Sequence, residues 1–221
     1  MSIITEYFQQ SELAFAAYAN LFPGISDDAY IINLKKAGMS NAQAEAFAAK
    51  WQVADSYPNP ITGVSATVFR EIGTNNTHLA IRGTTVSDLR DMFANVELAI
   101  GIPSYLNLQF ALLLPEVVEW VDDGTLTNGF SVAGHSLGGY VATAIKTCFT
   151  ESSDVYTFNG PGVGGLAGNV FDLAGDAFKA AFDLPDIALV DGIKNIRGSA
   201  GLSVIGTPQR YAFIFNDPDF L

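Results

Sequence analysis

The sequence contains few of the residue types on which several common functions depend. It has one cysteine, two histidines and 11 lysines and arginines among 221 residues, against 23 aspartates and glutamates. A single thiol, Cys148, excludes an internal disulfide, and its place in an apolar helical stretch favours an inert buried side chain. The formal net charge of −12 argues against nucleic acids and anionic membrane surfaces as partners.

The sequence also lacks a recognisable leader and an uninterrupted apolar run. Residues 1–22 show no basic start followed by an apolar core, so we expect no Sec-type signal peptide. The stretch from Leu98 to Pro115 is uncharged, but Pro103 and polar side chains interrupt it. We therefore expect a helix pair broken at residues 101–103 and no stable transmembrane segment. A cytoplasmic location and export through a C-terminal signal both stay open.

Apolar residues make up 49% of the chain, enough to fill one substantial core. We expect residues 1–221 to form a single domain, with residues 1–60 as a helical N-terminal segment of it. Short apolar strands alternate with helices in the remainder, which is typical of an α/β fold with a mostly parallel sheet covered on both faces. Strands are predicted at 64–72, 77–82, 130–133, 155–158, 193–197 and 211–215, and helices at 5–19, 40–51, 87–98, 104–121, 137–149 and 166–182.

The segment from Gly134 to Gly139 reads Gly-His-Ser-Leu-Gly-Gly and lies between a predicted strand and a predicted helix. In that context Gly-x-Ser-x-Gly indicates a nucleophile elbow, a turn so sharp that the serine hydroxyl stands exposed above the sheet. Ser136 is therefore the candidate nucleophile, and the N–H of Leu137 at the helix start is a candidate oxyanion donor. A glycine-rich turn that happens to contain a serine is the structural alternative.

Two further segments accompany the elbow. Leu79 to Thr85 ends a strand in Arg-Gly-Thr, which places backbone N–H groups at the carboxyl edge of the sheet, where open α/β folds bind ligands. The segment from Tyr156 to Gly164 reads Tyr-Thr-Phe-Asn-Gly-Pro-Gly-Val-Gly. The segments Leu79 to Thr85, Val132 to Gly139 and Tyr156 to Gly164 follow one another along the chain in the order found in the class 3 lipase family, the fungal-type lipases and their bacterial relatives. The sequence resembles this family over about residues 60–205.

The resemblance implies an α/β-hydrolase fold and a serine hydrolase of carboxylic esters, with a lipid or short-chain ester as substrate and no metal or cofactor. It implies Ser136 as the acylated nucleophile, with Leu137 and Thr84 as oxyanion donors. Arg82 would anchor the loop that follows it, although an ion pair with a nearby aspartate fits equally well. The stretch at residues 92–110 lies where these lipases carry a lid, and phospholipase A1 specificity stays as open as triacylglycerol specificity.

The general base is missing from its expected place. In the hydrolase order the acid and then the histidine follow the serine, but no histidine follows Ser136. His78 is expected at a strand edge or turn, and the side chain of His135 is expected to point away from the serine. The acid is equally uncertain, because Asp191 precedes the strand at 193–197 instead of following it.

Two hypotheses follow from this gap. In the first, the sequence is a bacterial lipase or esterase without the C-terminal remainder of a longer chain, which carries the histidine. In the second, the chain is a non-catalytic pseudohydrolase or binding module that keeps the fold. A peptidase or acyltransferase on the same fold is less favoured by the motifs.

Overall fold

The structure, a computed structural model, describes residues 2–59, 63–83, 98–149, 152–160, 192–198 and 212–215. These residues include one seven-stranded sheet in which each strand lies beside the next strand of the chain. The strands are β1 (Trp51–Pro58), β2 (Ser65–Glu71), β3 (Thr77–Arg82), β4 (Ser131–His135), β5 (Val155–Phe158), β6 (Ile193–Gly198) and β7 (Ala212–Phe215).

The sheet is antiparallel at one end and parallel over the rest. Strands β1, β2 and β3 pair antiparallel, and β2 and β3 form the predicted hairpin. From β3 to β7 every described pair is parallel. Parallel strands need crossover connections, which here place helices against the sheet. The result confirms the predicted α/β class with a mostly parallel sheet.

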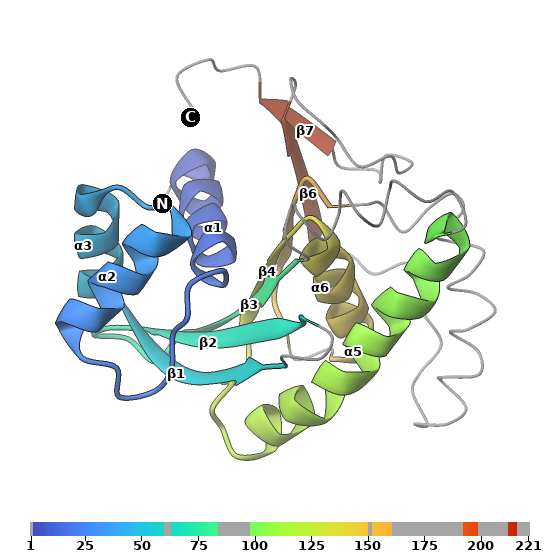
Figure 1. Ribbon diagram of the computed structural model, residues 1–221, viewed down its shortest axis with the longest axis horizontal. Helices are drawn as coiled ribbons and strands as arrows, with labels where there is room; N and C mark the ends of the chain where they lie inside the picture. Colours follow the sequence, from blue (N-terminus) through green and yellow to red (C-terminus); the bar gives the residue numbers. More distant parts are fainter. Residues whose placement is uncertain are drawn as a thin grey trace.

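Helices cover both faces of this sheet (Figure 1). Helices α1 (Ile3–Ala16), α2 (Asp27–Ala37) and α3 (Asn41–Lys50) lie on one face, and α5 (Leu98–Asp122) and α6 (Leu137–Cys148) lie on the other. The alternation of side chains along the strands divides the core accordingly. Leu79, Ile81 and Val132 pack with α5 and α6, whereas Ala80 and Ala133 pack with α1 to α3.

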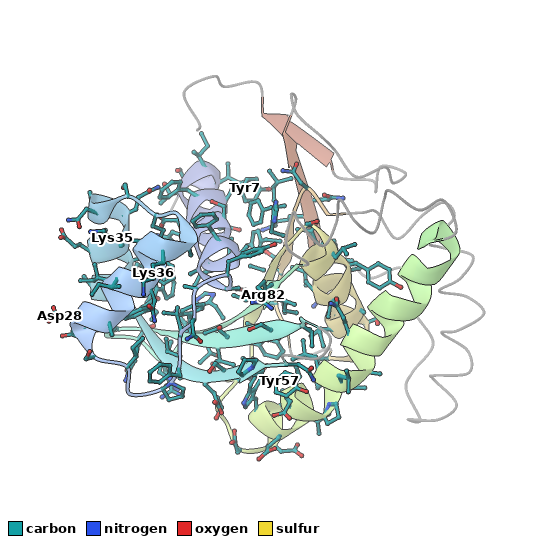
Figure 2. The ribbon with its side chains drawn as sticks, viewed as in Figure 1. Tyr7, Asp28, Lys35, Lys36, Tyr57 and Arg82 are labelled. Carbon is teal, nitrogen blue, oxygen red and sulfur yellow. The ribbon has the colours of Figure 1, made fainter. Side chains whose placement is uncertain are left out.

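The N-terminal layer is built from capped helices. Ser40 caps α3 as predicted, and it forms a full capping box with Gln43. Helix α2 was not predicted, because only Tyr30 and Leu34 of its side chains are buried. Capping stabilises it instead: Ser26 accepts the N–H of Ala29 at its start, and acidic side chains in the first turn and lysines in the last complement the helix dipole (Figure 2).

The expectation of a helical N-terminal segment over residues 1–60 does not hold for its last residues. Residues Trp51–Pro58 form β1, which pairs with β2 through a register shift between Val53 and Asp55. The carboxylate of Asp55 accepts a hydrogen bond from Trp120 Nε1 at 2.9 Å, which joins the edge strand to α5. The polar residues Gln52, Asp55 and Ser56 interrupt the apolar pattern of β1 and conceal its strand character in the sequence.

Helix α5 also differs from expectation. It is continuous from Leu98 to Asp122, so the predicted break at residues 101–103 is wrong. Pro103 is the sixth residue of this helix and cannot donate to the Ala99 carbonyl, yet α5 continues past the lost bond. No helix in the described ranges is long and apolar enough to span a membrane.

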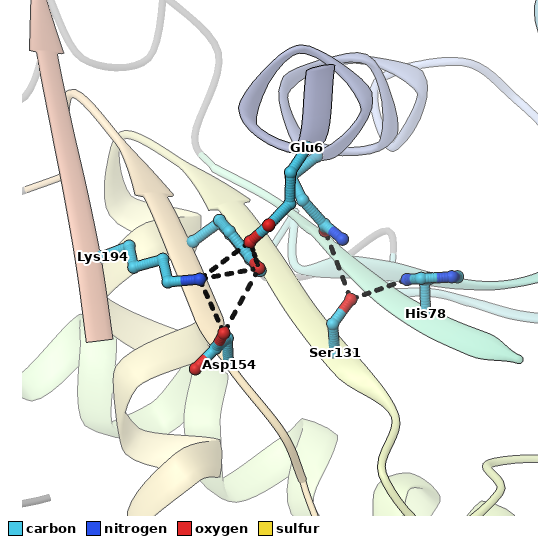
Figure 3. Close-up of polar contacts among 7 residues, drawn as sticks. Glu6, His78, Ser131, Asp154 and Lys194 are labelled. Carbon is cyan, nitrogen blue, oxygen red and sulfur yellow. Dashed lines mark hydrogen bonds and ion pairs between the residues drawn. The ribbon is translucent and has the colours of Figure 1, made fainter. Parts of the chain in front are cut away.

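A charged cluster ties α1 to the sheet at the amino ends of β5 and β6 (Figure 3). Lys194 Nζ lies 2.8 Å from Glu6 Oε1, 2.6 Å from Asp154 Oδ2 and 3.1 Å from the hydroxyl of Tyr156. Burial alone would lower the pKa of Lys194, but the hydrogen bonds to Asp154 and Glu6 raise it above its usual range. The cluster lies at the opposite end of the strands from the elbow and is structural.

Lys194→Met should lower the free energy of unfolding by about 1 kcal/mol, because it leaves two carboxylates facing each other beside a partly solvated site. Urea unfolding at neutral pH measures this loss. Lys35→Met is the matched control and should lower stability less, since Lys35 is exposed, its Nζ contacts the side chain of Asn41 at 2.8 Å, and its charge at the end of α2 is solvated. Equal stabilities of the two variants would contradict a structural role for the cluster.

Candidate active site

Ser136 occupies the turn between β4 and α6 in a backbone conformation that serine rarely adopts. Its φ is 53° and its ψ is −127°, a combination that costs an L-residue about 1–3 kcal/mol. The turn is held on both sides, because the Ser136 N–H donates to the Phe158 carbonyl at 2.9 Å and the Ser136 carbonyl accepts the Gly139 N–H at 2.9 Å. Backbone strain is thus concentrated at the serine of the motif.

Close backbone approach explains two of the glycines in the motif. A Cβ on Gly134 would lie 2.3 Å from the Gly138 carbonyl oxygen, and a Cβ on Gly138 would lie 2.4 Å from the Ile81 carbonyl oxygen. Both distances are far below van der Waals contact, so neither position accepts a side chain without a backbone shift. The glycines let α6 start directly against β3 and β4, as a nucleophile elbow requires.

The side chain of Ser136 is not used as a helix cap. A serine at the start of a helix normally accepts an N–H of the first turn, but Ser136 makes no such bond to α6 and the residue is 5% exposed. Leu137 is the first residue of α6, where backbone N–H groups have no partner within the helix. At the elbow, the Ser136 hydroxyl makes no capping bond and lies next to the N-terminus of α6, which favours negative charge.

The end of β3 lies beside the elbow. Arg82 Nη2 donates to the Gly63 carbonyl at 2.6 Å, which ties the end of β3 to the segment before β2. Gly83 follows, and a Cβ there would lie 2.4 Å from the His135 carbonyl oxygen. Thr84, the candidate second oxyanion donor, lies outside the described residues, as do the aspartates considered as partners of Arg82.

His78 lies far from the elbow along the sheet. It pairs with Ser131 at the amino end of β4, five residues before Ser136, or about 16 Å along a strand. Its Nδ1 is 2.6 Å from Ser131 Oγ, which donates to Gln10 Oε1 at 3.2 Å (Figure 3). Strand β3 is an interior strand, so the expectation of a strand-edge position for His78 is wrong.

His135 neighbours the serine in sequence, but its ring faces the α1 layer. Its Nδ1 lies 3.0 Å from the hydroxyl of Tyr18, and the two rings meet edge to face. Burial lowers the pKa of His135, so the ring is neutral at neutral pH. The contact spans 117 positions of the chain, and no motif in the sequence indicated it.

Several predicted features lie outside the described residues. They are Asp191, residues 92–97 of the region assigned to a lid, the helix expected at 166–182 and nearly all of the helix expected at 87–98, whereas residues 98–110 of the lid region form the start of α5. Cys148 lies at the end of α6 with intermediate exposure, and burial raises the pKa of its thiol. Among the described residues, no group of histidine, cysteine and acidic side chains could hold a metal ion.

Two solved structures with this arrangement are lipases of fungi. The LIP2 lipase of Yarrowia lipolytica superposes with a TM-score of 0.52 at 17% identity, covering 89% of this chain and 71% of that one. Lipase II of Rhizopus niveus gives a TM-score of 0.50 at 14% identity, covering 89% and 73%. The chain has the α/β-hydrolase fold of the fungal-type lipases.

The MDLA protein of Penicillium cyclopium shares this lipase-like fold with a TM-score of 0.58, at 16% identity and with 90% of this chain and 72% of that one covered. No family model matches the sequence, and no curated protein matches it. At these identities the likeness concerns the fold, and the chemistry has to be argued from the residues of this chain.

Proposed function

We propose that this protein is a serine hydrolase of carboxylic esters, of lipase, esterase or phospholipase A1 type, that forms an acyl-enzyme on Ser136. The observation that carries the proposal is the strained backbone of Ser136 at the turn between β4 and α6. Strain of this kind persists only where the surrounding structure enforces it, and it is common where a nucleophile must be presented. The fungal lipases with the same fold support this assignment.

In the proposed reaction the Ser136 oxygen attacks the ester carbonyl carbon and its proton passes to a general base. The N–H of Leu137 stabilises the oxyanion, and Thr84 supplies the second donor. Collapse of the tetrahedral intermediate breaks the bond to the leaving alcohol, and water then hydrolyses the acyl-enzyme with the same base. The substrate class is a lipid or short-chain ester, and no metal or cofactor takes part.

The base of this reaction is neither of the two histidines in the sequence. His78 lies at the far end of β3, and Nδ1 of His135 is in contact with Tyr18. Without a base most of the rate of a catalytic triad is lost, and only the contribution of the oxyanion hole and binding remains. We therefore expect little Ser136-dependent turnover of p-nitrophenyl butyrate by the 221 residues alone.

Added imidazole can serve as the base in an experiment. We expect imidazole to accelerate the release of nitrophenolate and the appearance of a butyryl group on the protein, detected by mass spectrometry and mapped to Ser136. Ser136→Ala should abolish both effects, with the imidazole-catalysed background subtracted. Ser153→Ala is the matched control, because it removes a serine hydroxyl that bonds the Phe130 carbonyl at 3.2 Å, away from the elbow.

The positions of the two histidines favour a second candidate function. A binding module that retains the lipase-like fold needs no base, and it accounts directly for two histidines of which neither is placed to accept the Ser136 proton. Such a module would show no imidazole-dependent acylation of Ser136, so the same experiment separates the two candidates.

A further inference from the structure

The hydroxyl of Tyr18 lies where the end of β3 meets the elbow. It comes from the turn that follows α1, on the helical layer opposite α6. The hydroxyl accepts the backbone N–H of Gly83 and lies 3.0 Å from His135 Nδ1. One side chain from the N-terminal layer therefore bridges two segments that adjoin the candidate active site.

The two hydrogen bonds of this hydroxyl are compatible with each other. Burial raises the pKa of Tyr18 to about 12, so the hydroxyl keeps its proton at neutral pH. Since the oxygen accepts the Gly83 N–H, the proton can be donated to Nδ1 of the neutral His135 ring. The bridge is complete in one protonation state and needs no charged group.

The backbone at Gly83 is packed closely against its neighbours, so a small displacement of this strand end would change its contacts with the elbow. A Cβ on Gly83 would lie 2.4 Å from the His135 carbonyl oxygen, 3.0 Å from the Tyr18 hydroxyl and 3.1 Å from the Gly138 nitrogen. The strand end is thus in contact with the backbone of the elbow on one side and with Tyr18 on another. The residue that follows Gly83 is the candidate oxyanion donor Thr84.

We infer that Tyr18 is a positioning residue of the proposed ester hydrolase: it fixes Gly83 against the elbow, and so sets where the oxyanion loop begins relative to Ser136. The inference rests on the proposed function. Oxyanion donors act only when they are held at the position that the developing charge will occupy, and small misplacements are costly in rate. Tyr18 itself contacts neither the ester nor the reacting atoms in this mechanism.

Tyr18→Phe tests the inference, because it keeps the ring and removes only the hydroxyl. In single-turnover acylation by p-nitrophenyl butyrate with imidazole, we expect the rate at saturating ester to fall about tenfold, with the half-saturating ester concentration unchanged. A residue with a purely structural role would lower the midpoint of thermal unfolding without this selective change in the acylation rate.

Tyr30→Phe is the matched control. Tyr30 lies in the same helical layer and donates to the Trp51 carbonyl at 3.1 Å, away from the elbow. We expect Tyr30→Phe to lose a similar amount of stability and to acylate at the unmodified rate. Hydrogen exchange adds a measurement that does not depend on activity: in Tyr18→Phe the Gly83 N–H should lose protection, while the Ser136 N–H, bonded to Phe158, should keep it.

The outcomes separate this inference from the function on which it rests. Acylation of Tyr18→Phe at the unmodified rate, or an equal loss in Tyr30→Phe, would overturn the positioning role alone. Unchanged protection of the Gly83 N–H would overturn it as well. Failure of the unmodified protein to acylate Ser136 would overturn the proposed function, and the positioning role with it.

Discussion

Gly138→Ala is expected to destabilise the protein by about 3 kcal/mol or more, because the new methyl group would overlap backbone atoms. The added Cβ would lie 2.4 Å from the Ile81 carbonyl oxygen and 2.8 Å from the Arg82 carbonyl carbon. These atoms belong to β3, which is paired on one side with β2 and on the other with β4, and cannot move without breaking a pairing. Relief would have to come from displacement of α6, which carries the elbow.

Gly139→Ala is the matched control, one residue along the same helix. Its Cβ would lie 3.1 Å from the Cβ of Thr157 and 3.3 Å from both the Gly134 carbonyl oxygen and the Gly160 Cα, contacts that shifts of a few tenths of an ångström relieve. Alanine in a helix is favoured over glycine by about 1 kcal/mol, which offsets part of the cost of these contacts. Urea unfolding of the two variants should therefore differ by about 2 kcal/mol or more. Equal stabilities would show that α6 is not held tightly against β3.

The sequence was most informative where a local pattern has one structural solution. The strands at Thr77–Arg82 and Val155–Phe158 were predicted with their observed bounds, because short apolar runs lie between turn residues. The elbow was located from glycine spacing, and the distances at Gly134 and Gly138 supply the physical reason for that spacing. The roles of Ser136, Leu137 and Thr84 stay predictions.

The sequence was less informative where capping or tertiary contacts decide the outcome. Helix α2 depends on Ser26 and on a left-handed Gly38, with few buried side chains to mark it. Strand β1 carries polar residues and is stabilised by its pairing with β2. The Tyr18 hydroxyl bridges Gly83 and His135, which lie far from it in the sequence, and local sequence patterns do not predict such a contact.

His78 gives the protein a predicted sensitivity to acid. The ring is packed against Trp51, with centroids 4.9 Å apart, and its Nδ1 contacts Ser131. Its Nε2 is buried and has no hydrogen-bond partner among the described residues. Burial lowers the pKa of His78 to about 4, while Glu71 raises it slightly and Lys50 lowers it. A proton on this ring would have to be accommodated without a carboxylate in direct contact.

The sign of the effect follows from the lowered pKa. An unfolded chain binds a proton at His78 near pH 6.5, whereas the folded protein binds it only near pH 4. The contribution of the neutral His78 ring to the free energy of unfolding is therefore complete above about pH 6.5 and is lost as the pH falls toward 4. The loss amounts to about 2 kcal/mol by pH 5 and about 3 kcal/mol by pH 4.

His78→Gln isolates this contribution, because an amide can still bond Ser131 but does not titrate. The free energy of unfolding of both proteins should be measured by urea denaturation from neutral pH down to about pH 5, above the sequence pI of about 4.3. Other carboxylates and His135 titrate alike in both proteins, so only the difference between the curves reports His78. We expect the advantage of the unmodified protein over His78→Gln to shrink by about 2 kcal/mol across this range. Parallel curves would mean that the buried ring accepts its proton as readily in the folded protein as in the unfolded chain.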